Sequence, residues 1–274
     1  MSGASGAFLG ALAPIVARKR EEASALRCAA AALWAKAEAC GPGRDFAASL
    51  AGGRVIAEMK RRSPSAGGLR ADLDPIVVAQ QYALGGAAAL SVLTDARDFG
   101  GSLEDLMAAR GAVKLPLLRK DFTVDPIQVA EARVAGADCV LLIVAVLGAE
   151  GLEECMEAAE RCGIDALVEV HDEAEAHLAA AAGATLVGVN NRDLRTLECD
   201  LGVFARVRRY LPAGAVTVAE SGIRTPDDVT RMVAAGADSV LVGEALMRAD
   251  DLAAASREMS VAARLGYNER VGGG

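Results

Sequence analysis

The chain has few aromatic residues and no excess of positive charge. Phe, Trp and Tyr make up 3% of its 274 residues, so few rings are available for stacking nucleic-acid bases. Asp and Glu number 37 against 29 for Lys and Arg, which gives a formal net charge of −8. An acidic chain is a poor general binder of nucleic acids and anionic membranes, so we expect neither as a partner. Any phosphate that it binds must meet a local positive site.

Metal-binding residue patterns are also missing. The two histidines of the sequence are His171 and His177, and its six cysteines form no Cys-x-x-Cys pair. These residues are too few and too badly placed for a zinc site or a catalytic metal triad, so we expect no metal. Scattered cysteines that act as small hydrophobic residues are typical of a reducing cytoplasm, which is the localisation we expect.

Long hydrophobic runs are absent too. The longest purely apolar run covers residues 139–147, far below the roughly 20 residues that a membrane helix needs. The apolar stretch at 7–17 has the basic pair Lys19 and Arg20 after it, which is the wrong order for a secretory signal. We therefore expect an amphipathic helix at this end of the chain.

One phrase recurs along the chain: a short segment containing glycine, followed by a short apolar run. It occurs at 135–143, 182–189 and 235–242, with looser versions at 85–93 and 163–168. Glycine suits the left-handed residue that ends a helix, and the apolar run suits a parallel strand covered on both faces. The phrase therefore predicts repeated helix-to-strand transitions.

The opposite ends of the helices are marked by residues that cap a helix. Three dipeptides place an N-cap side chain before a proline at the first helical position, and two further pairs resemble capping boxes. The dipeptides are Asp74-Pro75, Asp125-Pro126 and Thr225-Pro226, and the pairs are Ser102 with Asp105 and Thr225 with Asp228.

Eight strands separated by helical stretches can be counted. Eight such units in about this length are typical of a single (β/α)8 barrel, an α/β fold, spanning residues 1–274. Residues 1–50 form an N-terminal helical extension, with helices at 7–28 and 29–40. An open doubly wound sheet is the alternative, but it usually has fewer strands, and no Gly-x-Gly-x-x-Gly follows the first strand. The predicted strands cover 55–60, 90–93, 117–120, 139–143, 166–170, 186–190, 216–220 and 239–242.

Polar side chains end several of these strands, where a barrel carries its catalytic groups. Each one alone is consistent with a solvated strand end. Together, at matching positions on five strands, they favour one shared site, because Lys and Glu in one pocket shift each other's proton affinity. The residues are Glu58, Lys60, Lys120, Glu169, Asn190, Arg192 and Glu220.

Glycine-containing turns follow the last two strands. Ser221-Gly222 comes after the seventh strand and Gly243-Glu244 after the eighth. Each is consistent with a tight turn, but the two together at this place favour a phosphorylated substrate held by backbone N–H groups. The segment 61–68 after the first strand is either a mobile loop that closes over an anion or a solvated loop.

With these residues the chain resembles the indole-3-glycerol phosphate synthases of tryptophan biosynthesis. The similarity spans about residues 10–250. The resemblance implies a carboxy-lyase that converts 1-(2-carboxyphenylamino)-1-deoxyribulose 5-phosphate into indole-3-glycerol phosphate with loss of CO₂ and water. It implies no cofactor. The matching segments are 15–20, 55–65, 91–95, 99–101, 118–122, 167–172, 190–194, 219–223 and 241–246.

The resemblance also implies roles for individual residues. Lys120 takes the role of the acid that protonates the ribulose carbonyl during ring closure, and Glu169, Lys60 and Glu58 match the residues that serve the dehydration, without a decision on which one donates. Substrate contacts are implied for Ser63, Phe122, Asn190, Arg192 and Glu220. The implied phosphate cradle consists of Ser221, Gly222, Gly243 and Glu244.

Three other functions remain open from the sequence. A phosphoribosylanthranilate isomerase would share the glycine turns without needing Glu58, Lys60, Lys120 and Glu169 together. A Schiff-base aldolase would use Lys60 or Lys120 as the nucleophile. A non-catalytic sensor would bind a phosphorylated ligand without turnover. The oligomeric state stays open, with a monomer slightly favoured.

Overall fold

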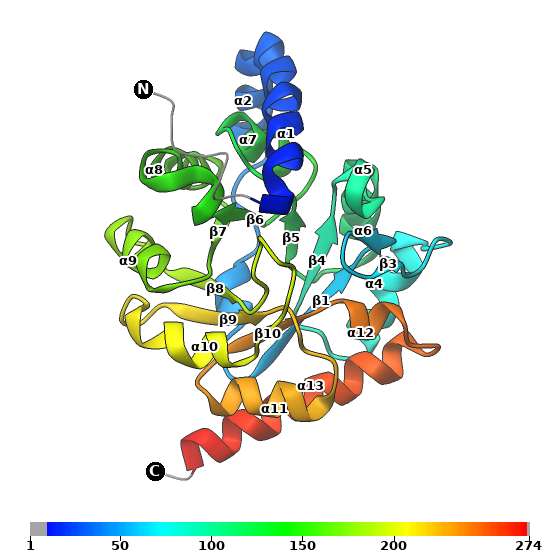
Figure 1. Cartoon of the computed structure of the whole chain (residues 1–274). Helices are drawn as coiled ribbons and strands as arrows, with labels where there is room; N and C mark the ends of the chain where they lie inside the picture. Colours follow the sequence, from blue (N-terminus) through cyan, green and yellow to red (C-terminus); the bar gives the residue numbers. More distant parts are fainter. Residues whose placement is uncertain (1–9, 273–274) are drawn as a thin grey trace.

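Eight parallel strands close into a barrel in the computed structural model, which describes residues 10–272 (Figure 1). The strand order around the ring is β1-β10-β9-β8-β7-β6-β5-β4, and β1 pairs with both β10 and β4. The (β/α)8 prediction is confirmed, and the open-sheet alternative is wrong because no barrel strand is left at an edge. The strands are β1 (Arg54–Met59), β4 (Ala89–Leu93), β5 (Leu117–Lys120), β6 (Cys139–Ile143), β7 (Asp165–Val170), β8 (Leu186–Asn190), β9 (Val216–Glu220) and β10 (Ser239–Val242).

Helices surround the barrel and alternate with its strands. Strand residues are almost all buried, because side chains on one face fill the barrel and those on the other pack against this outer layer. A small hairpin of β2 (Arg62–Ser63) and β3 (Gly67–Gly68) follows β1. The helices are α1 (Ala13–Leu26), α2 (Ala30–Ala39), α3 (Phe46–Ser49), α4 (Pro75–Leu84), α5 (Ala96–Phe99), α6 (Leu103–Ala112), α7 (Ile127–Val134), α8 (Val144–Cys162), α9 (Glu173–Ala181), α10 (Gly202–Val207), α11 (Pro226–Ala234), α12 (Glu244–Met247) and α13 (Leu252–Gly272), with 3-10 turns at Gly10–Leu12, Arg27–Ala29 and Arg208–Tyr210.

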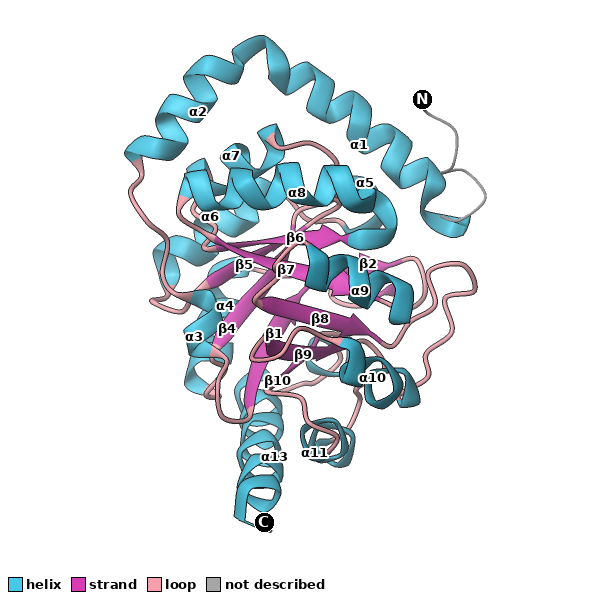
Figure 2. Ribbon diagram, turned by 90° about the vertical axis from the view of Figure 1, so that its left-hand side faces the viewer, coloured by secondary structure: helices cyan, strands magenta, loops and turns pink. Residues whose placement is uncertain are grey.

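The N-terminal extension consists of α1 and α2, which lie over α7 and α8 (Figure 2). The two helices predicted at 7–28 and 29–40 are both found, with the 3-10 turn Arg27–Ala29 between them. Residues 7–9 of the first predicted helix lie outside the described residues. Leu12 and Ile15 are buried at this end of the chain, so the extension packs against the barrel rather than lying free.

The recurring phrase has the conformation expected of it. Gly136 and Gly236 have φ of +96° and +108°, so each ends its helix in the region that glycine tolerates best. Each glycine is followed two residues later by an aspartate, Asp138 or Asp238, whose hydrogen bonds the sequence did not predict. Asp138 Oδ2 accepts a hydrogen bond from the backbone N of Leu117 at 3.0 Å, and Asp238 Oδ2 accepts one from Thr217 N at 3.0 Å. Each carboxylate thereby connects one strand to the amino-terminal side of its neighbour.

Most of the predicted helix caps are present. Asp74 accepts from the backbone of Ile76, and Thr225 forms a reciprocal capping box with Asp228. Two expectations need correction. Pro126 is the N-cap residue and not the first helical residue, because α7 begins at Ile127. The Ser102 capping box is half formed: Ser102 accepts from Asp105 N, while the Asp105 carboxylate binds the Arg61 guanidinium instead.

None of the helices that the structure describes combines enough length with enough apolar character to span a lipid bilayer.

Candidate active site

One cavity opens at the carboxyl ends of the barrel strands, and all thirteen residues proposed from the sequence line it. They come from segments that are far apart in the chain, so the ring of strands is what brings them together. The residues are Glu58, Lys60, Ser63, Lys120, Phe122, Glu169, Asn190, Arg192, Glu220, Ser221, Gly222, Gly243 and Glu244.

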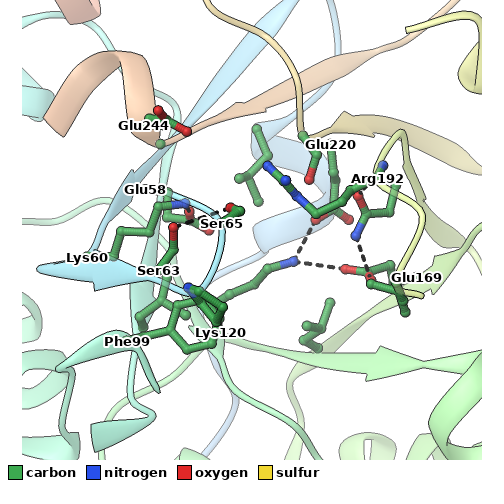
Figure 3. A pocket seen from close by; sticks show the side chains of 18 of the residues that line it. Glu58, Lys60, Ser63, Ser65, Phe99, Lys120, Glu169, Arg192, Glu220 and Glu244 are labelled. Atoms are coloured by element: carbon green, nitrogen blue, oxygen red, sulfur yellow. Dashed lines mark hydrogen bonds and ion pairs between the residues drawn. The ribbon is translucent and has the colours of Figure 1, made fainter. Parts of the chain in front are cut away.

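Lys120 lies at the centre of the cavity's charged cluster (Figure 3). Its Nζ donates to Glu220 Oε2 at 2.6 Å and to Glu169 Oε2 at 3.0 Å. Burial opposes the charge on Lys120, but the two carboxylates outweigh it and raise the pKa of Lys120. The amine is therefore an ammonium at neutral pH, which is the form of a proton donor and not of a nucleophile.

The two carboxylates beside Lys120 differ in proton affinity. Burial alone would raise the pKa of Glu169, but Lys120 and His171 outweigh it and hold that pKa well below its usual range. Burial, offset in part by Lys120 and reinforced by Glu169, raises the pKa of Glu220 to about 7. Oε1 of Glu220 is buried and has no hydrogen-bond partner among the residues that the structure describes. One site thus holds an ionised carboxylate next to one that carries a proton at slightly acidic pH, a pairing suited to acid–base chemistry.

A second ion pair lies across the cavity. Lys60 Nζ donates to Glu58 Oε1 at 2.6 Å, and the Ser91 hydroxyl donates to Glu58 Oε2 at 3.3 Å. Figure 3 shows this pair on one side and Lys120 with Glu169 on the other. The backbone of Gly243 runs close to the pair, and a Cβ at this position would meet Glu58 Oε1. The cavity therefore contains two lysine side chains, Lys60 and Lys120, each paired with a carboxylate.

Asn190 ends β8, and Arg192 follows two residues later. The Asn190 side chain donates to Glu169 Oε1 at 3.0 Å, and its own oxygen accepts from the backbone N of Arg192 at 3.0 Å. The Arg192 guanidinium is fixed by a bond to the Leu197 carbonyl at 2.7 Å. This guanidinium lines the cavity and retains donors for an anionic oxygen.

The turns after β9 and β10 form the other side of the cavity. Ser221 and Gly222 have φ of +64° and +79°, so two consecutive residues adopt the left-handed conformation. Glu244 is the first residue of α12, and N–H groups in the first turn of a helix have no acceptor within the helix. Turns of this kind aim backbone N–H groups at an anion.

The segment 61–68 directs its two arginines away from the cavity. Arg61 binds the Asp105 carboxylate, and Arg62 donates to the carbonyls of Ala96 and Arg97. Ser63 and Ser65 of this segment do line the cavity. The arginines therefore anchor the hairpin to α5 and α6.

Several lining residues were not proposed from the sequence. Leu12 and Ile15 come from the N-terminal extension, Phe99 packs against Phe122 with ring centroids 6.2 Å apart, and Arg224 follows the phosphate-type turn. A basic residue directly after Gly222-Ile223 is a signal that could have pointed to Arg224.

His171 directly follows β7, and its side chain is largely buried between Glu169 and Glu175. Within residues 10–272, no group of three or more His, Cys, Asp or Glu side chains is arranged to hold a metal ion.

A closed parallel barrel with a buried Lys–Glu cluster and glycine turns at the carboxyl ends of its strands defines a (β/α)8 enzyme of the phosphate-binding type. A model of the family described as indole-3-glycerol phosphate synthase matches residues 12–259. The chain belongs to this family.

Two relatives named indole-3-glycerol phosphate synthase illustrate the match. The protein of a Nocardioides species is 56% identical over 210 residues, covering 77% of this chain and 81% of its own. The protein of a Parafrankia species is 51% identical over 244 residues, covering 88% of this chain and 89% of its own. These relatives do not favour the isomerase or aldolase alternatives.

Solved structures with lower identity share the fold. Thiamine phosphate pyrophosphorylase from Pyrococcus furiosus matches with a TM-score of 0.60 at 18% identity, covering 79% of this chain and 98% of its own. A 3-hexulose-6-phosphate synthase matches with a TM-score of 0.59 at 18% identity, covering 76% and 99%. At these identities the likeness concerns the fold alone.

Proposed function

We propose that this protein is an indole-3-glycerol-phosphate synthase, a carboxy-lyase. It converts 1-(2-carboxyphenylamino)-1-deoxyribulose 5-phosphate into indole-3-glycerol phosphate, CO₂ and water. The observation that carries the proposal is the Lys120 ammonium held by Glu169 and Glu220 in the same cavity as the Lys60–Glu58 pair and the two glycine turns.

Ring closure is the first chemical step. The aromatic carbon that bears the carboxylate attacks the ribulose carbonyl carbon, and Lys120 gives a proton to the carbonyl oxygen as the C–C bond forms. The carboxylate then leaves as CO₂, and its bonding electrons restore the aromatic ring. The charged state of Lys120 supports this role over that of a Schiff-base nucleophile.

Dehydration completes the indole. The new hydroxyl leaves as water after receiving a proton, and a proton is lost so that the ring double bond can form. Glu169, Lys60 and Glu58 supply this acid and base. Ser63, Phe122, Asn190, Arg192 and Glu220 position the substrate, and backbone N–H groups at Ser221, Gly222, Gly243 and Glu244 bind its phosphate.

The direct test is an assay that follows indole fluorescence after addition of the ribulose phosphate substrate, with and without a chelator. We expect turnover that the chelator leaves unchanged. Borohydride reduction in the presence of substrate should leave the protein mass unchanged. A covalent adduct on Lys60 or Lys120 would instead support the aldolase chemistry.

We further propose that the enzyme acts in the cytoplasm on this phosphorylated small molecule, as a monomer. Cys139, Cys155 and Cys162 support the first part because they are buried as free thiols. Sedimentation of the purified protein tests the second part.

A further inference from the structure

His171 is a buried titratable residue that the chemistry above does not use. It directly follows β7, and its side chain is 14% exposed. On one side, Nδ1 lies 2.9 Å from Glu175 Oε2, and the same oxygen accepts from the backbone N of His171 at 2.8 Å. On the other side, Nε2 lies 3.4 Å from Glu169 Oε1, an ion-pair contact with the central carboxylate of the cavity.

These residues form a row of alternating charge that runs from α9 into the cavity. Glu175 on α9 faces His171, His171 faces Glu169 on β7, and Glu169 faces Lys120 on β5. Glu220 on β9 ends the row beyond Lys120. Burial lowers the pKa of His171, but Glu169 and Glu175 outweigh it and raise the pKa to about 10. The imidazole is therefore cationic at neutral pH.

The two oxygens of Glu169 consequently have different surroundings. Oε1 faces the Asn190 amide at 3.0 Å and the His171 imidazolium at 3.4 Å. Oε2 faces only the Lys120 ammonium, at 3.0 Å, among the contacts of the described residues. Among the described residues, His171 Nε2 makes no hydrogen bond, so its contact with Oε1 is an ion pair, and the Asn190 amide is the donor to Oε1. A proton that passes between Lys120 and Glu169 therefore moves through Oε2, the oxygen that accepts from Lys120.

We propose that His171, held by Glu175, is a positioning residue that fixes the Glu169 carboxylate against Lys120 and leaves Oε2 as its proton-exchanging oxygen. The pairing itself stands on geometry, and its effect on turnover rests on the proposed function of Glu169. The arrangement follows the same principle as a catalytic triad. There a carboxylate orients an imidazole, and the imidazole acts on the reacting group.

Nuclear magnetic resonance of the ring nitrogens tests the pairing without any substrate. The chain has two histidines, so ¹⁵N-histidine labelling gives two sets of ring signals. We expect His171 to stay doubly protonated through neutral pH and to titrate near pH 10, well above the ordinary histidine value of about 6.5. The exposed His177 gives the second set of signals. Glu175→Gln and Glu169→Gln should each lower the titration point of His171. Titration of His171 at the ordinary value would overturn the proposal.

Kinetics test the consequence. His171→Gln keeps a donor near Glu169 but removes the charge, so we expect kcat to fall by roughly 10- to 100-fold, the scale of a lost partner to a buried charged group. The acidic limb of the kcat profile should move to higher pH, because Glu169 loses a cation that favours its ionised form. His177→Gln is the matched control and should leave both quantities unchanged.

An unchanged pH profile with kcat near that of the unsubstituted enzyme would overturn the proposal. If His171→Gln fails to fold, the ring-nitrogen titration of the unsubstituted protein decides the matter. Failure of the unsubstituted protein to turn over the ribulose phosphate would contradict the proposed function, while the titration would still report on the His171 pairing.

Discussion

The Lys120 side chain pairs with two carboxylates, Glu169 and Glu220, and its charged end lies in the cavity. The side chain ends in a cavity, so Lys120→Ala leaves the strand core unchanged. We expect turnover to be abolished and circular dichroism to show that the fold is retained. The thermal midpoint should fall, because Glu169 and Glu220 lose the buried cation that they share. A variant that keeps near-normal kcat would show that another group protonates the carbonyl.

Glu169 is the carboxylate whose ionised form is stabilised by Lys120 and His171. Glu169→Gln keeps the shape of the side chain but loses its ability to exchange a proton. We expect kcat to fall by roughly two to four orders of magnitude, the usual scale for a lost acid–base group. The fluorescence assay measures this directly, and a value within a few-fold of the unsubstituted enzyme would remove Glu169 from the mechanism.

Gly188 on β8 leaves the space that the Glu220 carboxylate occupies. A Cβ at this position would overlap Glu220 Oε1 and press on Leu167, so Gly188→Ala pushes Glu220 away from Lys120. We expect kcat to fall roughly 10- to 100-fold, as for other small displacements of a catalytic group.

Gly111 provides the matched control for this substitution. It lies in α6, where a Cβ would meet nothing within 4 Å. Gly111→Ala should leave kcat unchanged and stabilise the fold by up to about 1 kcal/mol. Equal kcat values for both alanine variants would contradict the role given to Gly188.

The charged residues of the candidate site were the part of it that the sequence predicted best. Glu58, Lys60, Lys120, Glu169 and Glu220 could be proposed because a charge at the end of an apolar strand is conspicuous. Contacts between residues that lie on different elements could not be predicted from the sequence. Gly188 sits inside a strand without any local sign of its neighbour, and the burial of His171 depends on Glu175, which belongs to the following helix.

At the scale of elements, α1 is attached to the barrel mouth by buried charges. Lys19 Nζ lies 2.8 Å from Asp121 Oδ1 and 3.2 Å from Asp95 Oδ2, and both carboxylates are buried. Ion pairs, in addition to apolar contacts, therefore hold this helix in place over the cavity. The amphipathic pattern predicted the helix, but Lys19 reads as a surface residue in the sequence because its two acceptors lie far away in the chain.

Lys19→Met tests this attachment. It removes one of the cations that contact Asp95 and Asp121, while Arg18 still pairs with Asp95 and Arg119 with Asp121. We therefore expect the free energy of unfolding to fall by about 1–3 kcal/mol. Urea denaturation measures the loss, and faster proteolysis within α1 should accompany it. The exposed Lys36 of α2 gives the control, and a similar loss for Lys36→Met would contradict a specific role of Lys19.

At the scale of the whole molecule, the two ends of the barrel differ: the cavity lies at the carboxyl ends of the strands, and contacts that stabilise the fold lie at their amino-terminal ends. The amino-terminal end contains Asp138, whose carboxylate accepts from the backbone of Leu117 and Arg44 and pairs with Arg110. None of these residues lines the catalytic cavity. In this fold, features at the amino-terminal face concern stability.

Asp138→Asn should therefore separate stability from activity. Removing a buried charge from among its cationic partners is expected to lower the free energy of unfolding by about 3–5 kcal/mol. The kcat of the remaining folded enzyme should stay within about twofold of normal, since the cavity is at the other end. Denaturation and active-site titration together measure both quantities, and a parallel loss of kcat would contradict the separation.

The barrel itself was predictable because its signals repeat. The glycine phrase occurs in five of the units and caps mark several helices, so an error in one unit, as at Pro126, does not change the count of eight. The order of strands around the ring and the pairing of β1 with β10 follow from closure, which no single unit encodes.

That pairing joins residues near position 55 to residues near position 240. A ribosome releases the chain from the N-terminus, so β1 gains its second neighbour only after the residues near position 240 have been synthesised. Until then a nascent chain holds two unpaired strand edges, the kind of surface that binds chaperones or neighbouring chains. Because Glu58 and Lys60 lie beside Gly243, their side of the cavity is completed only after β10 has been synthesised and paired with β1.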